Sequence, residues 1–143
     1  LIVKLTPNTG EIVTIAREVA AAGADALCLI NTLRGMTIDI KTKKPLLGNV
    51  FGGLSGPAIK PVALAMVYQV ACAVDVPIVG CGGVTTARDA IEFILAGATA
   101  VEMGTINFTD PASPAGVIAG IRKYLRDEKI ADINSLVGAA LKK

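Results

Sequence analysis

Short apolar runs alternate with longer amphipathic segments along the chain. The apolar runs cover residues 1–5, 26–30, 77–80 and 100–103 and show little alternation, as is typical of parallel strands buried on both faces. The first intervening segment repeats its apolar residues three and four positions apart, which is the period of a helix. They are Ile12, Ile15, Ala16, Val19 and Ala20. The pattern predicts four strands, each followed by a helix.

Turn and capping residues set the expected limits of these helices. We expect Thr9 to cap the first helix, and Pro61 to lie in the first turn of a second helix that begins near Lys60. Thr86 is placed to cap the third helix, with Asp89 in the position of a capping box. Two further helices are predicted, from Ala115 to about Arg126 and from Asp132 or Asn134 through Leu141.

Residues 31–55 are too long for a simple strand-to-helix loop. Residues 36–40 alternate, 41–45 are polar, and 46–50 are apolar again, which predicts a β-hairpin excursion from Met36 to Val50. Long connections inside a small domain are usually functional, although a plain surface hairpin fits the same pattern.

Repeated strand–helix units form either an open doubly wound sheet or a (β/α)8 barrel. A whole barrel needs about 250 residues, so 143 residues with four units would make half of one. The chain opens inside a strand, with no Met and no lead-in, which we interpret as a piece of a longer polypeptide. We therefore expect residues 1–143 to be one half of a barrel, and the first half of that barrel to lie outside this chain.

Composition narrows the function classes. Aromatic residues make up 3% and Trp is absent, which argues against a base-stacking nucleic-acid surface, and the net charge of +2 is too small to indicate a polyanion partner. No apolar run reaches the ~18 residues of a membrane span. The cysteines Cys28, Cys72 and Cys81 lie in apolar stretches without metal spacing, so we expect buried reduced thiols, no metal site and a cytoplasmic location. Since His is absent, the commonest general base is missing.

Glycine corners follow the third and fourth predicted strands. Gly82 and Gly83 come between a strand and a helix cap, and Gly104 with Thr105 ends the next strand. A strand, a tight glycine turn and a helix N-terminus together present backbone N–H groups that can bind a phosphate. Ordinary strand-to-helix turns have the same appearance, so the corners alone leave both interpretations open.

Five motifs, in order and with compatible spacing, extend over nearly the whole chain. They are Val3–Asn8, Ile30–Thr32, Gly52–Pro61, Gly80–Val84 and Met103–Phe108. Together they resemble the C-terminal half of dihydroorotate dehydrogenase, and the residues of the motifs are most similar to those of the catalytic subunit of the NAD-linked form. Cys81 departs from the pattern, since a larger side chain such as Met is expected there.

The resemblance implies an α/β fold that is the C-terminal half of a (β/α)8 TIM barrel carrying FMN. It implies oxidation of dihydroorotate to orotate in pyrimidine biosynthesis. Electrons would pass to NAD through a separate subunit with FAD and a [2Fe-2S] cluster, and the catalytic subunit would form a homodimer within a heterotetramer.

The resemblance also implies roles for individual residues. Lys4 should approach the flavin ring, where a cation balances the charge of the reduced form. Asn31 and Thr32 should hydrogen-bond the substrate, and Ser55 is a further candidate contact. The remaining expected flavin contacts, from ring to phosphate, are Ile30, Gly56, Gly82, Gly83, Gly104 and Thr105.

The catalytic base is expected elsewhere. In the NAD-linked type it is a cysteine on a loop of the first half-barrel, and none of the three cysteines here matches that position. We therefore assign no catalytic base in this chain. Three alternatives stay open: the fumarate-linked form of the same family, a barrel isomerase or lyase that binds a sugar phosphate, and a non-enzymatic half-barrel that self-associates through its sheet edges.

Overall fold

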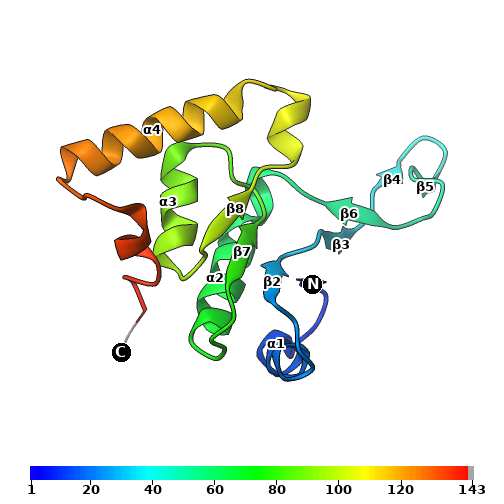
Figure 1. Ribbon diagram of the computed structural model, residues 1–143. Helices are drawn as coiled ribbons and strands as arrows, with labels where there is room; N and C mark the ends of the chain where they lie inside the picture. The colour runs from blue at the N-terminus through cyan, green and yellow to red at the C-terminus, as the bar shows by residue number, and fades with distance from the viewer. Residues whose placement is uncertain (142–143) are drawn as a thin grey trace.

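A computed structural model describes residues 1–141. Four strands form one parallel sheet in the order β1-β2-β7-β8, without a reversal (Figure 1). Their bounds are β1 Ile2–Leu5, β2 Ala26–Leu29, β7 Ile78–Cys81 and β8 Ala100–Glu102. All four agree with the predicted apolar runs to within one residue at either end.

The helices pack against one face of this sheet. Helix α1 contacts β1 and β2, α2 contacts β2 and β7, and α3 contacts β8, while α4 packs on α3. Their bounds are α1 Ile12–Ala21, α2 Lys60–Ala71, α3 Ala87–Leu95 and α4 Ser113–Asp127, with single 3-10 turns at η1 Pro57–Ile59, η2 Thr105–Phe108 and η3 Ile133–Leu136. None of the helices in residues 1–141 is long and apolar enough to cross a bilayer.

The core lies between the sheet and these helices. Leu27, Leu29 and Ile78 reach into it from the strands, and Phe93 of α3 is fully buried. Gly80 makes room for Phe93, because a Cβ at this position would lie 2.6 Å from the ring. The opposite face of the sheet carries Lys4 and Glu102, whose side chains are 45% and 51% exposed.

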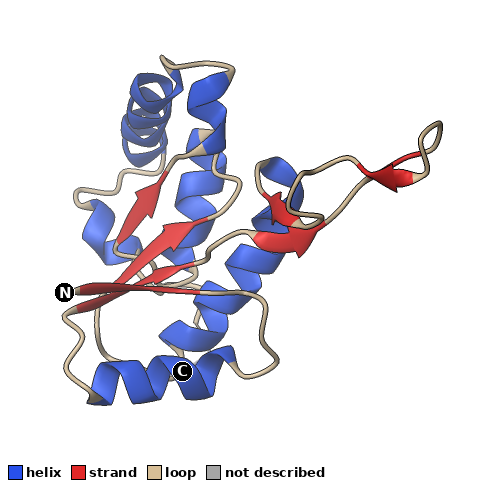
Figure 2. Cartoon of the chain, turned by 90° about the vertical axis from the view of Figure 1, so that its right-hand side faces the viewer, coloured by secondary structure: helices blue, strands red, loops and turns tan. Residues whose placement is uncertain are grey.

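The segment between β2 and α2 contains two nested antiparallel pairs. Strand β3 (Leu33–Gly35) pairs with β6 (Gly52–Leu54), and beyond them β4 (Ile38–Asp39) pairs with β5 (Lys44–Pro45). This excursion projects away from the sheet in both views (Figures 1 and 2). Its strands differ from the expected ones, because residues 46–50 form turns and the chain pairs again only at β6. Arg34 of β3 lies over the ring of Phe51, 4.0 Å from its centroid, and so connects β3 with the residue that precedes β6.

Three local predictions are wrong. Thr9 does not cap α1, because its hydroxyl accepts from the Glu11 N–H in the turn before the helix. The predicted last helix is only the η3 turn, because Gly138 has φ +71° and its N–H donates to Ile94, which docks the segment on α3. Cys72 is exposed rather than buried, whereas Cys28 is buried and Cys81 is half-buried.

The third helix begins as predicted. Thr86 is its N-cap and accepts from the Asp89 N–H, while the Asp89 carboxylate accepts from the Thr86 N–H. Helix α2 likewise begins at Lys60 with Pro61 in its first turn. Both helix starts lie beside the carboxyl ends of the strands, so their geometry bears directly on the candidate site.

Candidate functional site

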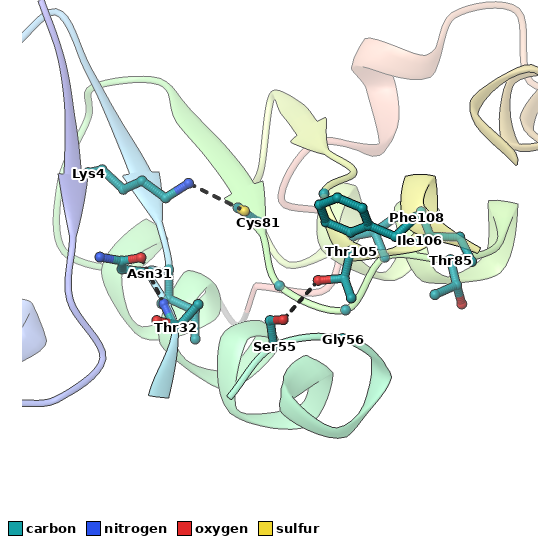
Figure 3. A pocket seen from close by; sticks show the side chains of 15 residues that line it. Lys4, Asn31, Thr32, Ser55, Gly56, Cys81, Thr85, Thr105, Ile106 and Phe108 are labelled. Carbon is teal, nitrogen blue, oxygen red and sulfur yellow. Dashed lines mark hydrogen bonds between the residues drawn. The ribbon is translucent and has the colours of Figure 1, made fainter. Parts of the chain in front are cut away.

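The carboxyl ends of the four strands surround one cavity of about 280 Å³ (Figure 3). All nine residues predicted to bind cofactor or substrate line it: Lys4, Ile30, Asn31, Thr32, Gly56, Gly82, Gly83, Gly104 and Thr105. They come from β1, from the loops after β2, β7 and β8, and from the turn before α2. The structure therefore brings together residues that lie up to a hundred positions apart in sequence.

The corner after β7 is fixed by its own packing. Gly82 and Gly83 have φ values of +138° and +75°, which side chains rarely adopt. A Cβ on Gly82 would lie 2.6 Å from the Ala63 Cβ, and one on Gly83 would lie 2.7 Å from the Gly56 carbonyl oxygen. The glycines here are required because α2 and its preceding turn approach the corner closely.

A network of ion pairs and hydrogen bonds stabilises the start of α3, which follows this corner. The Lys60 ammonium lies 2.5 Å from Asp89 Oδ1 and 2.7 Å from Glu92 Oε2. The second Asp89 oxygen accepts from the N–H groups and hydroxyls of Thr85 and Thr86 at 2.8–3.0 Å. Burial alone would raise the Asp89 pKa, but the bonds from Lys60 and Thr85 outweigh it and hold that pKa well below its usual range. The bonds from Lys60 to Asp89 and Glu92 raise the pKa of Lys60.

The corner after β8 is open. Gly104 has φ −103°, and a Cβ added to it would meet no atom within 4 Å. The Thr105 hydroxyl donates to Ser55 Oγ at 3.0 Å, which links this corner to the turn before α2 (Figure 3). The Asn107 amide donates to the Met103 and Gly104 carbonyl oxygens at 2.6 and 3.1 Å. Nothing within the described chain requires glycine at position 104.

Backbone donors at the two corners are free to bind an anion. Within residues 1–141, the N–H groups of Gly82, Gly83 and Gly104 donate to no other residue. All three glycines line the cavity. Unpaired N–H groups at successive strand-to-helix turns form the kind of concave site that takes a phosphate.

Lys4 lies at the other end of the cavity, within a cluster of titratable side chains. Its ammonium is 3.2 Å from Glu102 Oε2 and 3.6 Å from Cys81 Sγ, and the Cys28 thiol donates to Glu102 Oε2 at 3.5 Å. The strand register explains the cluster, because Lys4 pairs with Cys28 and Cys81 pairs with Glu102 on the same face of the sheet.

The charges in this cluster stabilise one another. Burial opposes the Lys4 charge, but the Cys81 thiolate and the bond to Glu102 outweigh it and raise the Lys4 pKa. Burial alone would raise the pKa of Glu102, but the bond from Lys4 and its charge outweigh burial and lower that pKa. The neighbouring Cys28 thiol and the Lys4 ammonium lower the pKa of Cys81 to about 7, whereas the proximity of Cys81 and burial raise the pKa of Cys28.

The loop after β2 carries the two predicted substrate residues. The Asn31 Oδ1 accepts from the Thr32 N–H at 2.9 Å, and Asn8 Nδ2 donates to the Thr32 carbonyl oxygen at 3.0 Å. Asn8 also accepts from the Arg34 N–H at 2.8 Å, so it ties the β1 loop to the start of β3. Ile30 is buried and follows a cis peptide bond from Leu29.

Glu102 and Phe108 add to the predicted residues at or near the cavity. Glu102 is the one charged residue of β8, and its position in the sequence does not indicate that it contacts Lys4. Phe108 lines the cavity mouth and is 92% exposed, which nothing in its local sequence indicates. The nine predicted residues do meet, and the charged partner of Lys4 is the main addition.

Comparison with known families gives one match over most of the chain. Residues 1–125 match the family model described as dihydroorotate dehydrogenase. The chain is 59% identical over 140 residues to the dihydroorotate dehydrogenase B (NAD(+)) catalytic subunit of Desulforudis audaxviator. It is 57% identical over 141 residues to the protein of the same name from Geotalea uraniireducens.

These relatives are longer than the chain. The alignments cover 98% and 99% of this chain but 46% of each relative, so the chain spans just under half their length. Among solved structures, the DHODH of Eimeria tenella in complex with ferulenol superposes with a TM-score of 0.80 at 28% identity. That superposition covers 97% of this chain and 38% of the other.

Proposed function

The chain belongs to the dihydroorotate dehydrogenase family, and we propose that it forms the flavin-binding half of an FMN-dependent enzyme that oxidises dihydroorotate to orotate in pyrimidine biosynthesis. The observation that carries this proposal is the convergence of all nine predicted residues on one cavity. Family membership replaces the alternative of a sugar-phosphate isomerase or lyase.

The residues present fit an FMN. Gly82, Gly83 and Gly104 would receive the phosphate through free N–H groups, with the Thr105 hydroxyl adjacent, and Gly56 and Ile30 would border the ring. Lys4 supplies a cation at the opposite end of the cavity. FMN, when bound, supplies the hydride acceptor.

The chain's own residues would orient the substrate and stabilise charge. Asn31 and Thr32 offer amide and hydroxyl groups on a loop held by Asn8, suited to the polar edge of an orotate ring. The Lys4 ammonium would stabilise negative charge that develops on the ring system beside it. The proton acceptor for the substrate is proposed to come from the remainder of the barrel, as a cysteine.

We further propose that the four strands are half of a (β/α)8 barrel. Support comes from a strand order without reversal, helices on one face and an exposed opposite face that carries Lys4 and Glu102. A doubly wound sheet would reverse its order and place helices on both faces. The assignment to the C-terminal half of the enzyme stays a prediction, as does the cytoplasmic location.

The electron acceptor is proposed to be NAD, reached through a partner subunit with FAD and an iron–sulfur cluster. Support for the partner comes from the relatives' name, which includes "catalytic subunit" and NAD(+). A homodimer within a heterotetramer stays a prediction, and the fumarate-linked form is the alternative within the family.

The test uses the complete barrel purified with its flavin. Anaerobic mixing with dihydroorotate is expected to reduce the flavin and bleach its absorbance in a single turnover. Lys4→Ala is expected to slow this reduction at least tenfold. Protein that carries no flavin, or flavin that dihydroorotate does not reduce, would overturn the proposed function. Reduction at the normal rate in Lys4→Ala would remove the role assigned to Lys4.

A further inference from the structure

Titratable side chains of Lys4, Cys28 and Cys81 surround Glu102. Ligand atoms of Cys28, Cys81 and Glu102 all lie within 4.8 Å of one another, which is the spacing of a metal site. The Lys4 ammonium, 3.2 Å from Glu102 and 3.6 Å from Cys81, is the cation that occupies this position. A divalent ion would have to displace it, so the cluster is better described by what the carboxylate does to the lysine.

Glu102 is the only carboxylate within salt-bridge distance of Lys4 in the described chain. It reaches Lys4 from β8, across the sheet from β1, and the Cys28 thiol donates to the same Oε2 atom. Lys4 lines the proposed flavin cavity, whereas Glu102 does not. The carboxylate therefore contacts the lysine without itself lining the cavity.

We propose that Glu102 is a positioning residue that holds the Lys4 ammonium at the cavity and offsets part of its charge, and so sets how strongly the protein favours an anionic flavin. This inference rests on the proposed function. A lone ammonium would stabilise negative charge on the ring more strongly than a paired one, because the carboxylate's field opposes the lysine's field at the ring. Glu102 thus limits the stabilisation of reduced flavin and favours its reoxidation.

Glutamine at position 102 separates charge from shape. Glu102→Gln keeps an oxygen that can accept from Lys4, but removes the negative charge. In the FMN-loaded complete barrel, the negative charge on the ring is then stabilised by a lysine whose positive charge is no longer offset by a carboxylate. We expect a higher flavin reduction potential and slower reoxidation of reduced flavin.

Sulfite binding gives a readout that does not depend on turnover. The sulfite lone pair forms a bond to flavin N5 and the ring takes up the negative charge, so affinity for sulfite reports how well the site stabilises an anionic ring. Glu102→Gln is expected to lower the sulfite dissociation constant roughly tenfold. An unchanged or higher dissociation constant in a folded, FMN-loaded variant would overturn the inference.

The double variant tests whether Glu102 acts through Lys4. Lys4→Met should weaken sulfite binding, and adding Glu102→Gln to it should change the affinity by less than about twofold. A full tenfold tightening in the Lys4→Met background would mean that Glu102 acts on the flavin directly, which contradicts a positioning role.

A matched control removes the same charge elsewhere. Asp127 pairs with Lys123 on the exposed surface of α4, four residues apart on one helix. Asp127→Asn should leave sulfite affinity unchanged, and a shift equal to that of Glu102→Gln would show that net charge alone is responsible and overturn the inference. If the unsubstituted protein bound no FMN, the proposed function would fail first, and the inference with it.

Discussion

The two glycine corners resemble each other in sequence but differ in what holds them. At the corner after β7, positive φ values and close contacts with Ala63 and Gly56 require Gly82 and Gly83 whether or not a ligand binds. At the corner after β8, Gly104 has an ordinary φ and open space around its Cα. Glycine at the first corner is therefore explained by the fold, whereas at the second corner no atom of the described chain requires glycine, which agrees with the proposed phosphate contact there.

This difference determines which substitution tests stability and which tests ligand binding. A change at the first corner tests stability and binding together and cannot separate them. A change at the second corner reports on the ligand, because the chain itself tolerates it.

Gly82→Ala should be the most destabilising change. The new Cβ would lie 2.6 Å from the Ala63 Cβ at φ +138°, so backbone strain and overpacking add. We expect a loss of about 3–5 kcal/mol in the free energy of unfolding, measured by urea denaturation of the complete barrel. A loss below about 1 kcal/mol would show that the corner is not fixed by packing.

Asp89→Asn should destabilise by about 2–3 kcal/mol at pH 7. The amide cannot balance the Lys60 ammonium, and it accepts more weakly from Thr85 and Thr86. Asp127→Asn is the matched surface control and should cost less than about 0.5 kcal/mol. Equal losses for the two variants would contradict a structural role for the Lys60–Asp89 network.

The cost of Asp89→Asn should also depend on pH. The Asp89 pKa is lowered in the folded protein, so its stabilisation is complete above the unfolded pKa of about 3.9 and is lost as pH falls toward the folded pKa. The stability difference between the two proteins should therefore shrink progressively below about pH 4. Urea denaturation at several acidic pH values measures it, and a difference that stays constant down to pH 2 would contradict this account.

Ser55→Ala should have a smaller effect. It removes the oxygen that accepts from the Thr105 hydroxyl, an exposed hydrogen bond worth about 0.5–1 kcal/mol. FMN affinity should fall about twofold to fivefold, because Thr105 is then less firmly oriented. Fluorescence titration with FMN measures this, and unchanged affinity would show that the bond between Ser55 and Thr105 is not used in binding.

Gly104→Ala should be nearly neutral for stability, within about 0.5 kcal/mol, because the added methyl group meets no atom of the chain. It should nevertheless weaken FMN binding at least tenfold, since the methyl group occupies the space of an approaching phosphate. A variant that is destabilised like Gly82→Ala would remove the contrast between the corners.

The sequence predicted the parts of the fold that depend on local pattern. Strand and helix positions follow from apolar periodicity, and the Thr86–Asp89 capping box follows from spacing alone. The last helix was wrong because Gly138 and contacts with α3 override local propensity there. The motifs located the site, because residues at strand ends must meet at one edge of a parallel sheet.

Contacts between side chains on different strands could not be predicted from the sequence pattern in the same way. Glu102 contacts Lys4 although β1 and β8 lie at opposite ends of the strand order, because both side chains project from the same face of the sheet. No spacing within the sequence indicates that pairing. Cys72 lies in an apolar stretch of the sequence but follows the last residue of α2 and is exposed, which the apolar pattern alone does not indicate.

The comparison of FMN with riboflavin tests the central claim most directly, because the two differ only in the phosphate. We predict that the complete barrel binds FMN roughly a hundredfold more tightly than riboflavin. Gly104→Ala should remove most of that advantage while riboflavin affinity stays nearly unchanged. Equal affinity for the two flavins in the unsubstituted protein would contradict a phosphate site at the two corners.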